Sequence, residues 1–417
     1  MNRSETKIAI LGAGVSGLVA AQRLENEGLA PHVFDSEERA GGRLKTDLKD
    51  SYQLDRGFQV LLDSYPMVKK YLDPKKLKLQ KLDPGAVVFK NGKQLVIGDP
   101  LRNPSFLLPT LFSPLASFQD KLKTFNLNKS LKNKSLEDVF ESKESSTLEY
   151  LREKGFSEHY IQNFFKPFFS GIYLEPELQT SSRMFEFVYK MFGTGSACIP
   201  LAGIEEIAKD LKANLKKTKF SFGQKVKRVE NRNIMFEDGS NKDFDFIIIA
   251  TDATAFISNL RDQEVEWKSC DTVYFETDQD IIARPLIGLI PDAELINNIF
   301  YHSSISNLSK GSKHLLSVTI VKDHKLSEME LVMQVEHDLA EHCGIRNLNF
   351  IKRYQIKKAL PKLDNLRYEL AASETQLMDG IFLAGDQLLN SSLNAAMISG
   401  ERSAEGLIQR LDGAYLA

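Results

Sequence analysis

The order of apolar and polar positions at the N-terminus predicts a β-α-β unit. Residues 8–11 form a continuous aliphatic run, which is typical of a strand buried on both faces of a sheet. Residues 14–27 have helical periodicity and are followed by Gly28, a residue type that often ends a helix. A second short apolar run, 32–35, predicts the neighbouring strand. A parallel sheet of an α/β domain begins in this way.

Later segments switch between strand-like and helical patterns. A hairpin is predicted over 87–96, because Asn91 and Gly92 separate two apolar runs. The other elements are helices over 135–190, 204–215 and 327–344, and strands over 226–230, 233–237 and 246–250. Residues 270–321 are expected to form strands and loops of a second sheet. The alternation predicts an α/β protein with an additional α+β region.

The residues around the first predicted helix favour dinucleotide binding. Gly12 permits the turn out of the first strand, Gly14 lets a pyrophosphate approach the backbone, and Gly17 allows close helix–sheet packing. Asp35 ends the second strand, at a spacing suited to a ribose hydroxyl. The alternative is a β-α unit that binds no nucleotide.

A glycine pair flanked by arginines distinguishes the expected cofactor. In Arg39-Ala-Gly41-Gly42-Arg43, backbone amides and a guanidinium can meet a diphosphate. NAD dehydrogenases have no need of this second element, so the cofactor is predicted to be FAD.

From Gly12 to Thr46 the sequence resembles the FAD site of the superfamily of amine oxidases, protoporphyrinogen oxidases and phytoene desaturases. A second signature of that superfamily matches Gly380-Ile-Phe-Leu-Ala-Gly385-Asp386 and the helix start at Leu393-Asn-Ala-Ala. The resemblance implies a Rossmann-like FAD-binding domain and a substrate-binding domain of helices and a mixed sheet. The FAD domain is expected from 1–80, 195–265 and 355–417, and the substrate domain from 81–194 and 266–354. No cysteine near the second signature suits covalent attachment, so the FAD is expected to be non-covalent.

The resemblance also assigns roles to further residues. It implies that the turn at Gly57 and Phe58 passes near the flavin ring and that the backbone of Val226 meets the adenine. The last helix would direct its N-terminus at the flavin pyrimidine edge, where the positive end of its dipole stabilises an anionic ring. The full set of expected cofactor-binding residues is Gly12, Ala13, Gly14, Ser16, Gly17, Asp35, Ser36, Arg39, Gly42, Arg43, Gly57, Phe58, Val226, Ala250, Thr251, Gly385, Asp386, Asn394, Ala395 and Ala396.

Two inserted stretches are expected to line an apolar substrate pocket. Residues 101–118 are apolar, and their prolines exclude one long helix. Residues 164–173 are rich in aromatic side chains and resemble the helical substrate region of desaturases, although such clusters usually form only core. The expected pocket residues are Phe106, Phe112, Phe165, Phe168 and Tyr173.

Departures from the superfamily pattern limit which reaction is expected of this chain. The segment 387–393 contains no aromatic residue, whereas amine oxidases usually have one there, facing the flavin. Ala202 also replaces the first glycine of a family turn that is usually Pro-x-Gly-Gly-Met. No active-site lysine can be assigned either, and its absence together with that of the aromatic residue favours desaturation of a carbon skeleton by hydride transfer to flavin N5. An amine oxidase with an altered aromatic cage and a flavin-binding protein without turnover are the alternatives, and the electron acceptor, O2 or a quinone, stays open.

Composition limits the compartment and the partners. The 417 residues suggest more than one domain, and a net charge of -2 gives no general attraction to nucleic acid. The three cysteines are widely spaced and form neither a disulfide nor a metal pattern, which fits a reducing cytoplasmic location. His337 and His342 lie on different faces of a predicted helix, so no metal site is expected. Lysines on both sides of 101–118 allow a peripheral contact with an anionic membrane, or simply a solvated face.

Overall fold

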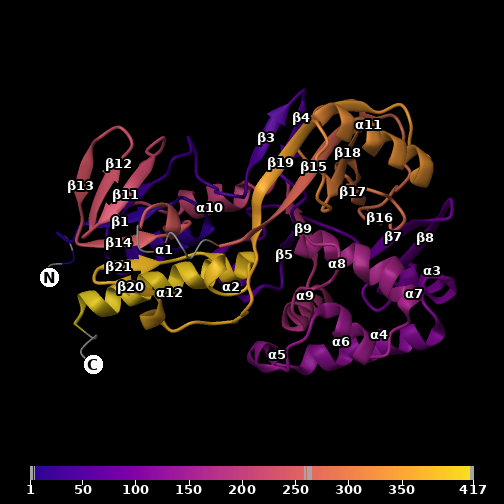
Figure 1. Ribbon diagram of the computed structural model, residues 1–417, viewed down its shortest axis with the longest axis horizontal. Coiled ribbons are helices and arrows are strands. Elements are labelled where there is room, and N and C mark those ends of the chain that lie inside the picture. The colour runs from indigo at the N-terminus through magenta and orange to yellow at the C-terminus, as the bar shows by residue number, and fades with distance from the viewer. Residues whose placement is uncertain (1–2, 4, 258–259, 261–264, 414–417) are drawn as a thin grey trace.

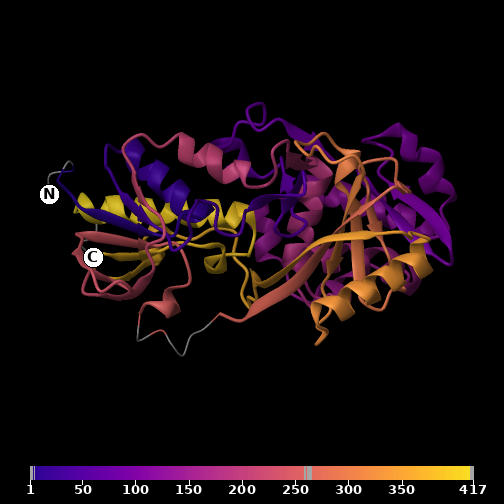
Figure 2. The same ribbon diagram turned by 90° about the horizontal axis from the view of Figure 1, so that it is seen from above.

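The molecule is elongated, with one large sheet in each half (Figure 1). The computed structural model describes residues 3, 5–257, 260 and 265–413. Both ends of the chain lie in the half that contains the first sheet. The long strands β15 and β19 extend from the second sheet toward the first half, as the view from above shows (Figure 2).

The first sheet has six strands and is almost entirely parallel. Its order is β10 (Lys219–Ser221), β2 (His32–Phe34), β1 (Ile8–Leu11), β14 (Phe246–Ile249), β21 (Ile381–Leu383) and β20 (Gln376–Met378), with β20 antiparallel to its neighbour. Ile8 and Ile10 face the helices α1 (Val15–Asn26) and α12 (Leu393–Leu411), whereas Ala9 and Leu11 face a small antiparallel sheet. That small sheet consists of β11 (Val226–Glu230), β12 (Asn233–Phe236) and β13 (Asn241–Asp243). The strand β1 is therefore buried on both faces, as its aliphatic run predicts.

The second sheet has seven strands and is mixed. Its order is β19 (Asn349–Pro361), β15 (Trp267–Thr277), β18 (His314–Ile320), β17 (Ile296–Tyr301), β16 (Ile287–Leu289), β7 (Gly85–Lys90) and β8 (Lys93–Gly98). One face, which includes Val273 and Val318, packs against Leu331 and Val335 of α11 (Glu328–Asp338). The opposite face contacts the helical layer through α8 (Lys166–Tyr173).

Short helices build a layer beneath the second sheet. They are α3 (Leu107–Phe112), α4 (Phe118–Asn133), α5 (Leu136–Glu141), α6 (Thr147–Glu153), α7 (Glu158–Tyr160) and α9 (Ser182–Thr194), and a π-helical turn, Ile161–Phe165, joins α7 to α8. The remaining elements are α2 (Pro66–Tyr71), α10 (Glu206–Ala213), the hairpin β3 (Thr46–Lys49) with β4 (Tyr52–Asp55), and the small sheet of β5 (Leu61–Leu62), β9 (Ala197–Pro200) and β6 (Leu79–Lys81).

The observed elements confirm the predicted fold class, an α/β protein with a Rossmann-like sheet and a second α+β region. The hairpin β7–β8 turns at Asn91 and Gly92, which both have positive φ as the predicted turn requires. The proposed division into domains stays a prediction. Strand β19 runs continuously through the expected boundary at 354/355, and the stretch before the expected boundary at 265/266 includes residues outside the described ranges.

Candidate functional site

A cavity of about 2170 Å³ opens where the parallel strands of the first sheet end and continues beneath the second sheet. Open α/β sheets bind ligands at the carboxyl ends of their strands. The cavity wall brings together most of the residues that the sequence assigns to the cofactor: Gly12, Gly14, Ser16, Asp35, Ser36, Gly42, Arg43, Gly57, Phe58, Ala250, Thr251, Gly385, Asp386 and Ala396. Segments from both ends of the chain thus meet in one cavity.

The turn after β1 is fastened to its neighbours by short hydrogen bonds. The backbone N–H of Ala13 donates to Asp35 Oδ2 at 2.6 Å, and that of Gly41 donates to the carbonyl of Ala13 at 2.9 Å. A Cβ on Gly42 would lie 3.2 Å from Gly14 Cα, so the glycine pair packs directly on the predicted phosphate turn. Larger side chains at these two positions would fill this space. Because both residues are glycines, the backbone stays exposed to a ligand.

Arg43 and Asp386 connect the two signatures. The Arg43 guanidinium contacts the carboxylate of Asp386 and donates to the carbonyl of Ala359 at 3.0 Å. It also lies 5.5 Å from the centre of the Trp267 ring. These contacts fix the guanidinium at the cavity wall, where a diphosphate could be bound.

Arg39 is placed differently from the prediction. Its guanidinium lies outside the cavity wall and is bound by Glu205 at 2.6 Å and by Asp47 at 2.7 Å. Two carboxylates already balance its charge, so the structure does not present Arg39 to a diphosphate.

Several other predicted cofactor residues lie behind the cavity surface. Asn394 is buried and accepts a hydrogen bond from Met67 N–H at 3.1 Å, which fastens α2 to α12. Val226 packs in the core between the first sheet and the small antiparallel sheet. Ala13, Gly17 and Ala395 are likewise outside the cavity wall. A role of these residues in binding the cofactor, including the expected backbone contact of Val226, stays a prediction.

The aromatic wall differs in part from the prediction. Phe168 and Tyr173 line the cavity, as expected. Phe165 is enclosed by other aromatic rings, Phe106 is fully buried under the Arg284 guanidinium, and Phe112 is 76% exposed on the surface. These three do not line the cavity.

Other aromatic wall residues were not among the expected pocket residues. Phe164 and Phe169 lie within the predicted stretch 164–173, whereas Tyr189 and Phe192 lie outside it. A helical signal was present, because Phe164, Phe168 and Ile172 repeat every four residues, and so do Met184, Val188 and Phe192. All six of these line the cavity.

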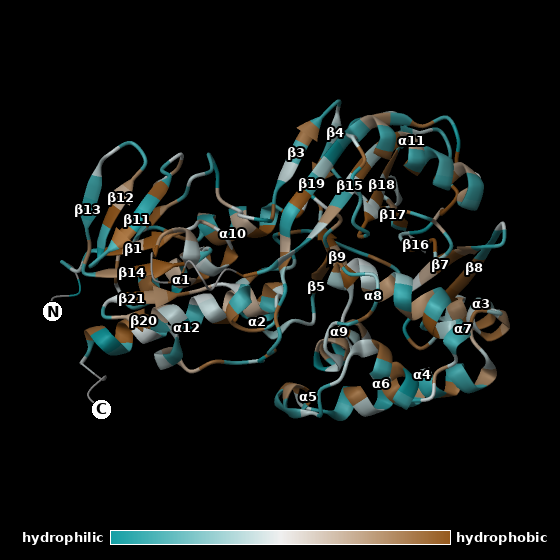
Figure 3. Ribbon diagram, viewed as in Figure 1, coloured by the Kyte–Doolittle hydropathy of each residue, from teal (hydrophilic) through white to brown (hydrophobic). Residues whose placement is uncertain are grey.

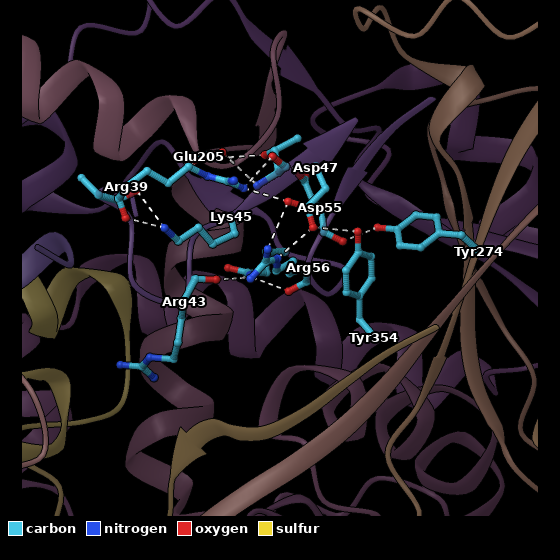
Figure 4. A network of polar contacts seen from close by, with 12 residues as sticks. Arg39, Arg43, Lys45, Asp47, Asp55, Arg56, Glu205, Tyr274 and Tyr354 are labelled. Carbon is cyan, nitrogen blue, oxygen red and sulfur yellow. Dashed lines mark hydrogen bonds and ion pairs between the residues drawn. The ribbon is translucent and has the colours of Figure 1, made fainter. Parts of the chain in front are cut away.

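A network of polar contacts borders the cavity between the two sheets (Figure 4). Asp47 accepts hydrogen bonds from Arg56 at 2.9 Å and from Tyr354 Oη at 2.9 Å, in addition to Arg39. Burial alone would raise the pKa of Asp47, but the hydrogen bonds from Arg56, Arg39 and Tyr354 outweigh it and lower the pKa to about 2. Asp47 therefore stays ionised over the whole physiological range.

Asp55 in the same network behaves in the opposite way. Its Oδ1 accepts hydrogen bonds from Thr46 Oγ1 at 2.6 Å and from Ile204 N–H at 3.0 Å. Burial raises the pKa of Asp55 to about 6 in spite of these bonds, and nearby Glu205 adds to the shift.

The pKa of Asp55 predicts a pH dependence of stability. Below the ordinary pKa of 3.8, Asp55 is protonated in both states and has no effect. As the pH rises from 3.8 to about 6, the unfolded chain has lost this proton while the folded protein still holds it, so the free energy of unfolding falls by roughly 3 kcal/mol in total. We expect Asp55→Asn to lose this decrease, and hence to gain stability relative to the wild type between pH 4 and pH 7, as urea unfolding would measure.

The control for this measurement is Asp238→Asn. Asp238 is exposed and its pKa is lowered by hydrogen bonds from Ser240, so the sign of its effect is opposite. A wild-type-like pH dependence in Asp55→Asn would show that another group causes it.

Comparisons with known proteins agree with this geometry. The family model described as flavin containing amine oxidoreductase matches residues 15–408. Protoporphyrinogen oxidase 2 of Arabidopsis thaliana is 28% identical over 172 residues, which is 40% of this chain and 32% of that protein, so the match spans about a third of the relative's length. The 4,4'-diapophytoene desaturase of Staphylococcus aureus is 38% identical over 56 residues, 13% of this chain and 11% of the relative. A putative protoporphyrinogen oxidase from Exiguobacterium has the same fold, with a TM-score of 0.70 at 18% identity, covering 98% of this chain and 100% of the other.

Proposed function

The chain belongs to the flavin containing amine oxidoreductases, and we propose that within this family it dehydrogenates an extended, largely apolar substrate. Membership makes it an FAD-dependent oxidoreductase related to protoporphyrinogen oxidases and desaturases. The substrate, the bond that is oxidised and the residues that bind the cofactor are parts of the proposal.

The residues around the phosphate turn fit an FAD. Gly14 and Gly42 leave backbone accessible, Arg43 supplies a cation at the cavity wall, and Asp35 follows β2 beside them. When bound, FAD accepts a hydride at its N5 atom. We propose that these four residues bind the diphosphate and the ribose, and that Gly57 and Phe58 lie beside the ring system.

The size and the lining of the cavity support an extended apolar substrate. About 2170 Å³ is roughly twice the upper end of ordinary ligand pockets, which leaves room for a cofactor and a long ligand together. Beyond the proposed cofactor site the wall is mostly aromatic and aliphatic, with Phe164, Phe168, Phe169, Ile172, Tyr173, Val188, Tyr189 and Phe192. Such a wall orients an apolar skeleton and excludes water from the reacting carbon atoms.

The residues that follow Asp386 in the cavity wall argue against the main alternative, an amine oxidase. Gln387, Asn390, Ser391, Ser392 and Leu393 line the cavity there, and none is aromatic. A substrate amine would lack the ring that holds it in amine oxidases, so we place the amine oxidase interpretation second. A flavin-binding protein without turnover is excluded by any substrate that reduces the flavin.

Anaerobic reduction of the flavin tests the proposed substrate class. The purified protein with its FAD is mixed with a carotenoid precursor, a porphyrinogen, benzylamine or putrescine, and the loss of the visible flavin band is followed. We expect reduction by an extended apolar compound and none by the small amines. Rapid reduction by the amines alone would refute the proposal and support an amine oxidase.

A variant of the aromatic wall tests whether the reducing compound binds there. Phe168→Ala removes part of the wall, and we expect KM for the reducing compound to rise by about tenfold, because a buried aromatic side chain is worth about 1.5–3 kcal/mol. Phe350→Ala, on β19 and outside the cavity wall, is the matched control.

We further propose that this protein rests on an anionic membrane through the surface around α3. The apolar patch consists of large side chains that are about half exposed or more: Leu101, Leu107, Leu108, Leu111, Phe112, Phe118, Leu122 and Phe125. Soluble proteins rarely expose so large an apolar surface without a partner. The patch lies at the end of the molecule far from both termini (Figures 1 and 3).

Charge and location favour a lipid surface as the partner. Residues 101–134 contain one arginine and five lysines against a single aspartate, Asp120, which is buried. A basic, apolar surface is attracted to anionic lipids. Leu107, Leu111 and Phe125 belong both to the patch and to the cavity wall, so an apolar ligand could pass directly from lipid into the cavity. Within the described ranges, no helix has the length and apolar character needed to cross a bilayer.

A further inference from the structure

The segment 39–46, called here the glycine-pair loop, is fixed at both ends by one buried carboxylate. We infer that Glu205 is the positioning residue of this loop for FAD, and that Arg39 is its anchor rather than a ligand of the diphosphate. The inference rests on the proposed FAD site and adds a residue that lies outside both sequence signatures.

The Glu205 side chain is only 3% exposed and binds the two ends of the loop with its two oxygens. Oε1 accepts a hydrogen bond from Arg39 Nε at 2.6 Å, and Oε2 accepts one from Thr46 N–H at 3.2 Å. The backbone N–H of Glu205 donates in turn to Thr46 Oγ1 at 3.1 Å. The carboxylate therefore sets the separation of the two ends.

Lys45 and Ala13 fix the middle of the loop. Lys45 Nζ donates to the carbonyls of Arg39 at 2.6 Å and Ala40 at 3.2 Å, and the N–H of Gly41 donates to the Ala13 carbonyl. The carbonyls are thus turned toward the protein interior, while Gly42 packs against Gly14 at the cavity wall. A displaced end of the loop would move both glycines relative to the proposed diphosphate site.

The positive charge of Arg39 is balanced by two carboxylates of the protein. Its guanidinium donates to Glu205, to Asp47 Oδ1 at 2.7 Å and to the carbonyl of Thr46 at 3.3 Å. Asp47 also binds Tyr354 of β19, so the anchor extends to the second sheet (Figure 4). A guanidinium paired with two carboxylates would have to break these bonds to reach a phosphate.

The turn before Glu205 explains why this residue reaches the loop. Gly203 has φ +89°, and a Cβ there would lie 2.5 Å from the side chain of Thr46. Its backbone consequently packs directly on the loop and brings Glu205 to Thr46. Ala202 does not have positive φ, so the replacement of the usual first glycine is compatible with this turn.

The test is the affinity of the protein for FAD, measured by returning FAD to the protein from which it has been removed. In Glu205→Gln the amide N–H₂ must face a donor of Arg39 or Thr46, and we expect the dissociation constant to rise about tenfold, as for the loss of a charge-assisted hydrogen bond. Arg39→Met should cause a similar loss. The double variant should be no worse than either single variant, because both substitutions break the same contact. Glu206→Gln, at the neighbouring half-buried position that pairs with Lys209, is the matched control and should bind FAD as the wild type does.

Salt dependence separates an anchor from a direct ligand. If Arg39 bound the diphosphate, Arg39→Met would weaken the salt dependence of FAD binding, whereas Glu205→Gln would not. Additive losses, a changed salt dependence in Arg39→Met alone, or unchanged FAD binding in Glu205→Gln would each overturn the inference. A wild-type protein that fails to bind FAD would instead overturn the proposed function.

Discussion

A Gly14→Val variant is expected to fold as the wild type does and to purify without FAD. The backbone of Gly14 has φ -75° and ψ 179°, which valine adopts without strain. A Cβ at this position would meet only Gly42 Cα, at 3.9 Å. The fold therefore tolerates the substitution.

The loss of FAD follows from the place of Gly14 in the cavity wall. Its position at the start of α1 is where a pyrophosphate would approach the backbone N–H groups and the positive end of the helix dipole. The valine methyl groups would occupy that space. We expect affinity to fall by roughly a thousandfold, because several charge-assisted hydrogen bonds of about 1.5–3 kcal/mol would be lost together. Absorption of the purified protein and titration with FAD measure the loss.

Two other substitutions show that the effect is local. A Cβ on Gly17 would lie 2.0 Å from the carbonyl oxygen of Gly12, so Gly17→Val should misfold instead of folding without FAD. Asp35→Ala removes only the proposed ribose contact and the acceptor for Ala13 N–H, and we expect FAD binding to weaken by about tenfold. Wild-type FAD affinity in Gly14→Val would place the cofactor elsewhere.

The features that could be predicted from the sequence depend on neighbouring residues. The buried strand β1, the helix α1, the hairpin at Asn91-Gly92 and the start of the helix α11 after Ser327 all occur where local pattern and turn chemistry place them. The glycines and the acidic residue of the first β-α-β unit meet at the cavity for the same reason. The strand, turn and helix that carry these residues follow one another along the chain and are also neighbours in the fold.

The features that could not be predicted depend on distant partners or on irregular backbone. Arg39 is bound by Glu205, 166 positions further along the chain, and no local pattern shows that partner. Phe165 was expected in the pocket, but it ends the π-helical turn Ile161–Phe165 and is enclosed by the rings of Phe156, Tyr160 and Phe185. Phe106 was also expected in the pocket, but its ring packs directly on Gly98 of β8. A Cβ on Gly98 would lie only 2.5 Å from that ring.

The second large effect is expected on the affinity of the protein for lipid vesicles. A variant with Leu107, Leu108, Leu111 and Phe112 all replaced by serine should lose about a thousandfold in affinity for vesicles of phosphatidylcholine and phosphatidylglycerol. Each apolar side chain that enters lipid contributes on the order of 1 kcal/mol or more, so removal of four costs about 4 kcal/mol. Co-sedimentation over a range of lipid concentrations measures this difference.

The patch is suited to such a contact because its helices are held in place. Lys121 Nζ donates to the carbonyls of Leu111 at 2.8 Å and Ser113 at 3.1 Å, which fastens the end of α3 to α4. Thr110 Oγ1 donates to the carbonyl of Gly98 at 2.9 Å and thereby fixes α3 on β8. The side chains replaced in the variant take no part in these hydrogen bonds and are at least half exposed, so the fold should be unaffected.

Matched substitutions on another surface decide whether the patch itself binds lipid. Met329 and Met333 are also highly exposed, but they lie on α11 and outside the patch. Met329→Ser with Met333→Ser should leave vesicle binding unchanged. Binding of the wild type should weaken as salt rises, since part of the attraction comes from the basic residues, and Lys129→Gln with Lys132→Gln should reduce that salt dependence. Equal losses in the methionine and the leucine variants, or no loss in either, would show that the apolar patch does not dock on lipid, while the proposed flavin chemistry would stand on its own test.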